Sequence, residues 1–239
     1  MDISTDKILS RSYLLLGEDG MQKMREAKVI IFGVGGVGSW CAESLVRSGI
    51  KNLTIVDSDC VCASNINRQL MATTHTIGEV KVMALKERLH TIMPGANIMA
   101  IADRFSEENA ESFNLGSYDY IIDAIDSLKD KATLILLATR TNAKFFSSMG
   151  AALKTDPRRI RVTEFWKVVG CPLARALRQR FKRIKKFPNR KFQCVYSDEL
   201  VKNKDMCNEE GANGTLMHVT ASYGLMLAGL VVCDIYSAQ

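Results

Sequence analysis

The sequence predicts an α/β protein with a Rossmann-like, doubly wound and mostly parallel sheet, followed by a C-terminal extension. Two observations lead to this fold class. Short β-branched runs alternate with amphipathic helical stretches, an order that is typical of parallel sheets covered by helices. A glycine-rich loop also joins the first of these runs to the helix after it, as in nucleotide-binding folds.

The first strand, loop, helix and second strand form one unit. Residues 28–32 read Lys-Val-Ile-Ile-Phe and are expected as a buried strand. A helix is expected over 40–48, where Gly49 stops it, and a second strand over 52–56.

The alternation continues beyond this unit. Apolar residues at helical spacing predict a helix over 79–93, which ends at Pro94 and Gly95. Further strands are expected at 96–102, 118–125 and 144–149, with a helix at 128–141. With 239 residues, 47% of them hydrophobic, the chain can bury a full core.

The glycine loop has the spacing of a dinucleotide-binding motif. Gly33, Gly35 and Gly38 match G-x-G-x-x-G, Gly36 adds another glycine, and Asp57 follows the second strand. Glycines permit a tight turn and close backbone approach, and the next helix offers free N–H groups to phosphates. The acid can accept hydrogen bonds from ribose hydroxyls. The alternative is a tight strand-to-helix turn that binds no ligand.

A set of polar residues after the second strand does not fit a plain dehydrogenase. It comprises Asp59, Asn65, Arg68, Gln69, Lys81, Asp123 and Asp126. Arg68 and Lys81 could neutralise a triphosphate, and Asp126, with Asp59 as a second candidate, could hold Mg²⁺. This set favours ATP over NAD. Taken singly, Lys81 could instead be a solvated helix residue, and Asp57 and Asp59 could be turn caps.

The positive charge of the chain is concentrated in one window. The net charge is +6, yet no Asp or Glu occurs between Phe165 and Ser197, where Lys and Arg recur. Such a window predicts a polyanionic partner. The candidate RNA-binding residues are Arg175, Arg178, Lys182 and Lys185. The alternative is a solvated amphipathic helix over 173–186. Both interpretations hold if the apolar face of this helix packs on the protein and its basic face contacts RNA.

Seven scattered cysteines without a Cys-x-x-Cys pair argue against a disulfide scaffold and a structural zinc site. They indicate free thiols in a reducing cytoplasm. Cys171 and Cys207 have polar neighbours and are expected to be exposed, which keeps a sulfur-transfer partner open. Residues 216–233 carry no formal charge and are expected as a buried core or interface helix, with a membrane contact as the alternative.

These motifs resemble the adenylating ThiF/MoeB superfamily, the fold of ubiquitin-activating enzymes. The resemblance rests on the loop 33–39, Asp57-Ser58-Asp59, the run 64–69, Lys81-Val82 and the run 123–126. Within the superfamily, the likeness is greatest to the bacterial branch that dehydrates tRNA threonylcarbamoyladenosine. Runs 11–17 and 194–197 also fit that branch, although no role can be assigned to Cys194.

The resemblance implies a role for each matching residue. The glycines would face the nucleotide phosphates, and Asp57 would hold the ribose. Asn65, Arg68, Gln69 and Lys81 would position the phosphates, and Asp126 would bind Mg²⁺. Arg11 would reach the ATP of the partner subunit in a homodimer. ATP and Mg²⁺ are the implied cofactors, with a monovalent cation as an optional addition.

The implied activity is ATP-dependent cyclisation of tRNA N6-threonylcarbamoyladenosine through activation of its carboxylate. One alternative is adenylation of the C-terminus of a ubiquitin-like sulfur carrier, and another is a non-catalytic nucleotide-binding protein. The expected organisation is a helical arm over 1–27, an ATP-binding core over 28–164, and a basic segment with the C-terminal part of the same domain over 165–239.

Overall fold

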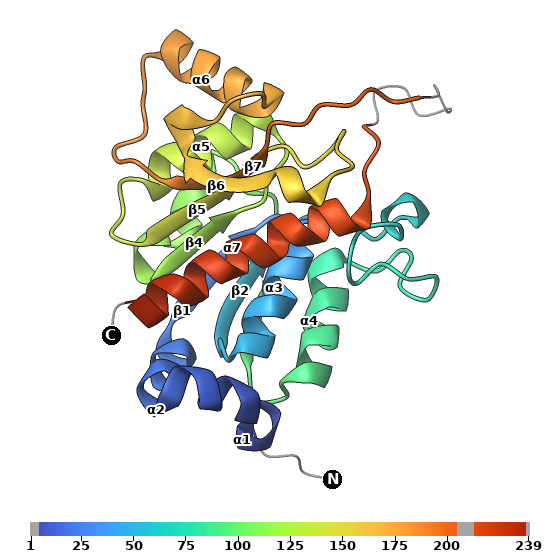
Figure 1. Ribbon diagram of the computed structural model, residues 1–239, viewed down its shortest axis with the longest axis vertical. Coiled ribbons are helices and arrows are strands. Elements are labelled where there is room, and N and C mark those ends of the chain that lie inside the picture. Colours follow the sequence, from blue (N-terminus) through green and yellow to red (C-terminus); the bar gives the residue numbers. More distant parts are fainter. Residues whose placement is uncertain (1–4, 205–212, 238–239) are drawn as a thin grey trace.

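A computed structural model describes residues 5–204 and 213–237 of the chain. Within these residues, one seven-stranded sheet has the order β3-β2-β1-β4-β5-β7-β6 (Figure 1). Neighbouring strands are parallel except β6 and β7, which are antiparallel. The strands are β1 (Lys28–Phe32), β2 (Asn52–Val56), β3 (Asn97–Ile101), β4 (Tyr120–Asp123), β5 (Lys144–Ser148), β6 (Ile160–Glu164) and β7 (Gln193–Ser197).

Helices cover both faces of this sheet, which confirms the doubly wound fold predicted from the alternation. Their bounds are α1 (Thr5–Ile8), α2 (Ser10–Glu26), α3 (Gly38–Ser48), α4 (Lys81–Ile92), α5 (Leu128–Ala138), α6 (Pro172–Ile184) and α7 (Met217–Ser237). The predicted helices differ from these bounds by a few residues at their ends, where helices fray. The strands β6 and β7 lie in a part of the chain for which no strand was predicted.

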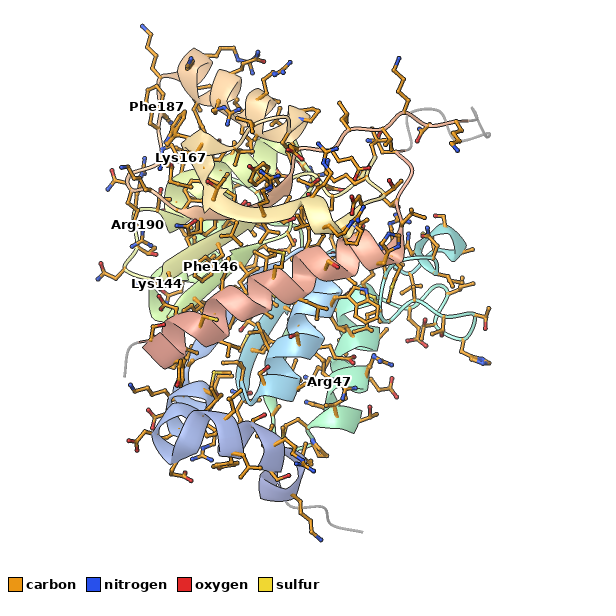
Figure 2. All side chains as sticks on the ribbon, in the orientation of Figure 1. Arg47, Lys144, Phe146, Lys167, Phe187 and Arg190 are labelled. Atoms are coloured by element: carbon orange, nitrogen blue, oxygen red, sulfur yellow. The ribbon has the colours of Figure 1, made fainter. Side chains whose placement is uncertain are left out.

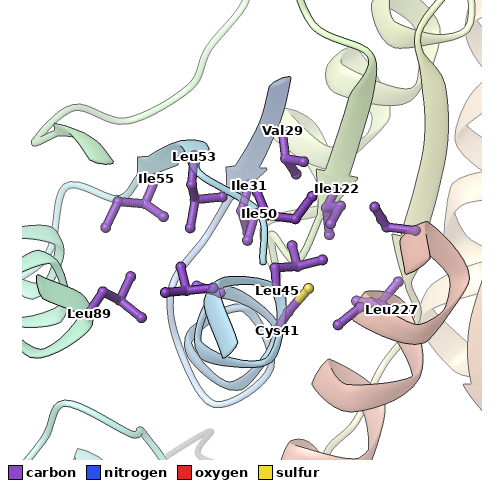
Figure 3. Packing of buried hydrophobic residues seen from close by; sticks show 14 of the residues in the cluster. Val29, Ile31, Cys41, Leu45, Ile50, Leu53, Ile55, Leu89, Ile122 and Leu227 are labelled. Atoms are coloured by element: carbon purple, nitrogen blue, oxygen red, sulfur yellow. The ribbon is translucent and has the colours of Figure 1, made fainter. Parts of the chain in front are cut away.

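Two buried clusters lie on the two sides of the sheet. Because side chains alternate along a strand, Val29 and Ile31 join the cluster under α3, α4 and α7, whereas Ile30 and Phe32 join the cluster under α5 and α6. Figure 3 shows the first cluster, with Leu45 of α3 packed between the strands and α7. The sheet is thereby fixed from both sides, and the loops at its carboxyl edge have a rigid base.

The helix α7 lies diagonally across the face that also carries α3 and α4 (Figure 1). By length and composition alone it could cross a membrane, but half of its most apolar window is buried in the protein. Val219, Leu227 and Val231 are fully buried in the first cluster, as expected for a core helix.

Candidate nucleotide site at the carboxyl edge of the sheet

The glycine loop connects β1 to α3 in a turn that only glycine fits at two positions. Gly33 has a φ of +84°, and a Cβ there would lie 2.7 Å from the carbonyl oxygen of Ala124. A Cβ at Gly38 would lie 1.8 Å from the oxygen of Gly33. The loop therefore exposes its backbone at the start of α3, where helix N–H groups and the helix dipole favour an anion.

Asp57 follows β2 and holds the glycine loop in place. Its Oδ2 accepts a hydrogen bond from the backbone N–H of Val34 at 2.8 Å, and its Oδ1 accepts one from the N–H of Asp59 at 3.0 Å. The carboxylate is half-buried. Its contact with a ribose stays a prediction, but it lies beside the loop as that prediction requires.

The polar run after β2 lies against the same loop. Arg68 Cγ lies 3.3 Å from the position that a Cβ of Gly36 would take, and Gln69 Nε2 lies 3.7 Å from that of Gly35. Arg68 Nη1 donates to the carbonyl of Ser64 at 2.7 Å. The run and the glycines, about thirty residues apart in sequence, are thus brought into contact.

Two amides in this run have different roles. The side-chain oxygen of Asn65 accepts a hydrogen bond from the backbone of Cys62 at 3.2 Å, so Asn65 shapes its own turn. Gln69 is buried, and its Oε1 has no hydrogen-bond partner within the described residues. A buried acceptor without a partner is costly, and a bound nucleotide that donates a hydrogen bond would satisfy it.

Lys81 is the first residue of α4, and its side chain is almost completely buried. Its Nζ lies 2.7 Å from Asp59 Oδ2, with side-chain exposures of 7% for the lysine and 65% for the aspartate. The interpretation of Lys81 as a solvated helix residue is therefore wrong. The exposed carboxylate of Asp59 binds the Lys81 ammonium, and Asp59 is linked through Asp57 to the glycine loop. A phosphate bound there can compete with Asp59 for the positive charge of Lys81.

Asp123 is the last residue of β4 and Asp126 follows the strand, and the two carboxylates face different surroundings. Asp126 is exposed, and its carboxylate forms no hydrogen bond with the described part of the chain. Asp123 is completely buried; it pairs with Lys131 Nζ at 2.8 Å and accepts from Ser147 Oγ at 2.7 Å. The prediction that Asp123 contacts the cofactor directly is therefore wrong, because its side chain faces α5.

This buried pair also fixes the backbone before Asp126. The N–H of Ile125 donates to Asp123 Oδ1 at 3.1 Å, and Lys131 Nζ donates to the carbonyl of Ile125 at 2.9 Å. Sequence reasoning missed Lys131. Its position five residues after Asp126, on the buried face of a helix, was the available signal.

Arg104, which follows β3, is a second charged group that sequence reasoning missed. Its guanidinium bonds Asp130 at 2.6 Å, and this hydrogen bond raises the pKa of Arg104, with smaller electrostatic contributions from Asp130, Asp126 and Asp59. The carboxyl edge of the sheet therefore carries a mixed set of acids and bases around the glycine loop.

The donor set suits magnesium bound together with a nucleotide. No group of three or more metal-binding side chains occurs among residues 5–204 and 213–237. Mg²⁺ commonly binds to one or two carboxylates, substrate phosphates and water. Asp126, an exposed carboxylate without a hydrogen bond, fits that mode. Asp59, which like Asp126 acts electrostatically on Arg104, is the candidate for a second oxygen donor.

Arg11 lies at the other end of the molecule from this site. It is exposed on α2, and its neighbour Leu9 packs 3.5 Å from the position that a Cβ of Gly49 would take. Gly49 ends α3, whereas the glycine loop begins it, and an 11-residue helix spans about 16 Å. The structure therefore does not bring Arg11 to its own chain's glycine loop.

The predicted RNA-binding residues lie on α6. Arg175, Lys182 and Lys185 are exposed. Arg178 is half-buried instead, and its Nη1 donates to the carbonyls of Phe165 and Val168 at 3.2 and 2.9 Å. Arg178 thus has a structural role that the sequence did not predict.

Two of the cysteines that the sequence singled out are buried, whereas Cys60, Cys62 and Cys233 are exposed. Cys194 is fully buried, and desolvation raises the pKa of its thiol well above the usual range, although Lys131 acts in the opposite direction. Cys171 is buried as well, so its predicted exposure is wrong. Cys207 lies outside the described residues.

Known proteins resemble this chain over nearly its whole length. A model of the ThiF family matches residues 9–232. The tRNA threonylcarbamoyladenosine dehydratase of Haemophilus influenzae is 40% identical over 73% of this chain and 68% of its own length. The enzyme of the same name from Bacillus subtilis is 34% identical over 95% of this chain and 93% of its own length.

The solved structures give the same result. The E. coli tRNA N6-threonylcarbamoyladenosine dehydratase in complex with AMP has a TM-score of 0.90 at 31% identity, covering 100% of this chain and 98% of that one. Its ATP complex has a TM-score of 0.88 with the same identity and coverage. A sulfur carrier protein adenylyltransferase from Thermus thermophilus is similar over a smaller part, at 33% identity over 47% of this chain and 41% of its own length.

Proposed function

The chain belongs to the ThiF family, and from that premise we propose that it uses ATP to dehydrate N6-threonylcarbamoyladenosine in tRNA. The observation that carries this function is the contact of the glycine loop with Gln69, Arg68 and the loop before Asp126. Relatives that act on a sulfur carrier match a smaller part of the chain, so the protein-substrate alternative is the weaker one.

The reaction requires activation of a carboxylate. A carboxylate oxygen attacks the α-phosphorus of ATP, pyrophosphate leaves, and an acyl adenylate forms. The carbamoyl group of the same side chain then attacks the acyl carbon and loses a proton, and AMP departs with the former carboxylate oxygen. The ring closes intramolecularly, which can contribute about 7–11 kcal/mol. The AMP complex of the E. coli relative favours adenylation over phosphorylation.

The residues of the site position ATP and neutralise its charge. The backbone N–H groups of the glycine loop receive the phosphates, and Asp57 and Gln69 are placed to receive the nucleoside. Arg68 and Lys81 offset phosphate charge, Lys81 by exchanging Asp59 for a phosphate oxygen. Asp126 would hold Mg²⁺, which supplies further charge neutralisation at the reacting phosphate. Such chemistry depends on electrostatic preorganisation and needs no nucleophilic side chain.

Arg11 completes the site from a second subunit. The position of α2 near the far end of α3 from the glycine loop favours a role in trans over one in cis, and an arginine can stabilise phosphate charge in a partner's site. Leu14 and Leu15, on the same helix, are 80% and 79% exposed, which supports a partner covering this helix. We therefore propose a homodimer.

The remaining assignments follow from this function. The exposed basic residues of α6 contact tRNA phosphates, and the enzyme works in the cytoplasm with its substrate. Cys60 and Cys62 are exposed beside Asp59 and are the residues at which a sulfur-transfer protein could act. A monovalent cation remains an optional cofactor, for which no residue is assigned.

The decisive test is mass spectrometry of tRNA nucleosides. The purified protein is incubated with ATP, Mg²⁺ and tRNA that carries threonylcarbamoyladenosine. A product lighter by one water is expected, together with AMP and pyrophosphate. ADP as the nucleotide product would contradict adenylation, and no dehydrated nucleoside would contradict the function itself.

A further inference from the structure

Two exposed aromatic rings beside α6 have no role in the nucleotide site. Trp166 is 40% exposed and Phe187 is 52% exposed, and their ring centroids lie 6.3 Å apart. One ring comes from the turn Phe165–Lys167 and the other from the loop after α6. Figure 2 labels Phe187, Lys167 and Arg190 on one flank of the molecule.

The ring of Trp166 is held on a rigid base. It packs edge-on against Phe165 with centroids 5.2 Å apart, and Phe165 in turn stacks on Phe192 at 5.0 Å. Both of these phenylalanines are buried. Arg178 donates to the carbonyls of Phe165, the first residue of this turn, and of Val168, the residue after it. The ring is therefore positioned before any ligand arrives, which lowers the entropic cost of binding.

The loop that carries Phe187 is also fixed. Lys185 ends α6 in a left-handed conformation with φ +52°, and the N–H of Lys186 returns to the carbonyl of Phe181 at 3.2 Å. The N–H of Asn189 donates to Thr139 Oγ1 at 3.0 Å, and Arg190 donates to the carbonyl of Ala143. These contacts tie the loop to the end of α5 and the start of β5.

The charge around these rings selects the kind of partner. Lys167, Lys185 and Lys186 are exposed next to the rings in sequence, and the window 165–197 contains no acid. The central apolar residues of α6, Leu177 and Phe181, are fully buried, and Ile184 at its end is 36% exposed, so the surface of the helix is mainly basic rather than the broad apolar face that a lipid bilayer would bind. A polyanion with flat apolar faces, namely RNA with unstacked bases, is the complementary partner.

We propose that Trp166 and Phe187 form a stacking platform for an unpaired base of the RNA substrate. The proposal deepens the proposed tRNA function and rests on it. The platform adjoins the end of α6, and 13 helical residues span about 20 Å. Glu164, just before the turn of Trp166, pairs with Gln193, the first residue of β7. This pair lies at the amino edge of the sheet, so the two rings lie at that edge as well. The stacked base is therefore not the adenosine that reacts at the carboxyl edge.

The test compares two RNA probes and a set of variants of the full chain. The probes are a labelled anticodon stem-loop with unpaired bases and a fully paired duplex of equal length. Trp166→Ala with Phe187→Ala is expected to weaken stem-loop binding roughly 5- to 150-fold, from the usual free energy of one base–aromatic stack. Duplex binding and the salt slope of binding should stay unchanged, because no charge is removed.

Controls separate stacking from loss of structure. Trp166→Phe keeps an aromatic ring and should bind the stem-loop with most of the parent's affinity, unlike the double alanine variant. Phe187→Ala alone changes only an exposed loop residue, so its effect on affinity cannot come from loss of the core. Val169→Ala removes a neighbouring exposed apolar side chain and should bind like the parent. Thermal unfolding checks that each variant is folded.

Three outcomes would overturn the platform. They are unchanged stem-loop affinity in the double variant, an equal loss for the duplex, and binding of the parent to anionic lipid vesicles that disappears in the double variant. Dehydration by the parent is measured in parallel. Parent turnover with unchanged variant affinity refutes only the platform, whereas no parent turnover refutes the proposed function.

Discussion

Lys131 and Asp123 form an ion pair without solvent exposure, directly beneath the loop that carries Asp126. Their hydrogen bonds clamp both peptide groups of Ile125. The neighbouring Ala124 carbonyl touches Gly33 closely enough to exclude a side chain there. One buried pair thus sets the distance between the glycine loop and Asp126.

We expect Lys131→Met to lower the free energy of unfolding by about 3–5 kcal/mol, because it leaves Asp123 uncompensated in the interior. The affinity for ATP should fall more when it is measured with Mg²⁺ than when it is measured in EDTA. The reason is that the loop of Asp126 loses the hydrogen bond from Lys131 to the carbonyl of Ile125. Urea unfolding and calorimetry measure the two effects. Lys131→Met with Asp123→Asn should recover part of the stability; equal stability of the single and double variants would contradict a charge effect.

Cys194 behaves as a packed thiol rather than a nucleophile, because burial raises its pKa. An unfolded thiol ionises near about 8.5, while the folded one stays neutral. The contribution of Cys194 to stability is therefore present at neutral pH. It is lost as the pH rises above the pKa of the thiol in the unfolded chain. The stability of Cys194→Ala should decline less between neutral and alkaline pH than that of the parent.

Alkylation gives a second measurement of this prediction. At mildly alkaline pH, iodoacetamide should label the exposed Cys60, Cys62 and Cys233 in the native protein, and should label Cys194 only in urea. Rapid native labelling of Cys194, or loss of tRNA dehydration in Cys194→Ala, would contradict the packed-thiol interpretation.

At the scale of elements, the sequence predicts a strand or helix well where one pattern dominates. The β-branched run of β1 and the amphipathic α4 are examples. The strand β6 was missed because Arg161 and Glu164 interrupt its apolar residues. The strand β7 was missed because its five residues, at the end of the basic window, carry little periodic signal. Both are ordered by their pairing, which is a tertiary contact.

The same limit applies to the site. Glycine spacing and strand ends predict that Arg68 and Gln69 lie near the glycine loop, and the structure brings both side chains against Gly35 and Gly36. The sequence did not show that the side chain of Asp123 lies on the same face of the sheet as that of Ile121, the face that α5 covers. Side chains alternate along a strand, and the sequence alone did not show which residue of β4 faces α5. The pairing of Arg104 with Asp130 likewise depends on neighbours 26 residues apart.

The exposed basic face of α6 yields a prediction for tRNA binding. Replacing Arg175, Lys182 and Lys185 by Gln should lower the magnitude of the log–log salt slope by about 2–3 units, since each phosphate contact contributes roughly 0.7–0.9. ATP affinity, measured by calorimetry, should not change. Arg178 is left in place because it bonds the turn below Trp166.

A matched control removes the same charge elsewhere. Lys28, Lys51 and Lys86, which lie on the amino end of the sheet and on α4, are replaced by Gln in one variant. An equal change of slope in this control would mean that net charge, rather than the α6 face, governs the affinity for tRNA.

At the scale of the whole molecule, the sheet joins segments from both halves of the chain. The strand β7 lies between β5 and β6, so residues 165–239 complete the same sheet as residues 28–164. The division at 27 and 164 therefore stays a proposal about function rather than about separate folding units. The described part of the arm, residues 5–27, packs near the far end of α3 from the glycine loop, so the proposed role of Arg11 at a nucleotide requires a second subunit.

Subunit mixing tests that arrangement. Arg11→Ala and Lys81→Ala are each expected to abolish dehydration of tRNA, but a mixed dimer has one site with Lys81 from one chain and Arg11 from the other. Equal mixing of two inactive homodimers gives half mixed dimers, each with one working site, so about a quarter of parental activity should return. Sedimentation and subunit exchange of tagged chains must first show that dimers exist and re-form. Exchange without restored activity would mean that Arg11 does not act across the interface, and a monomer at working concentration would exclude the shared site altogether.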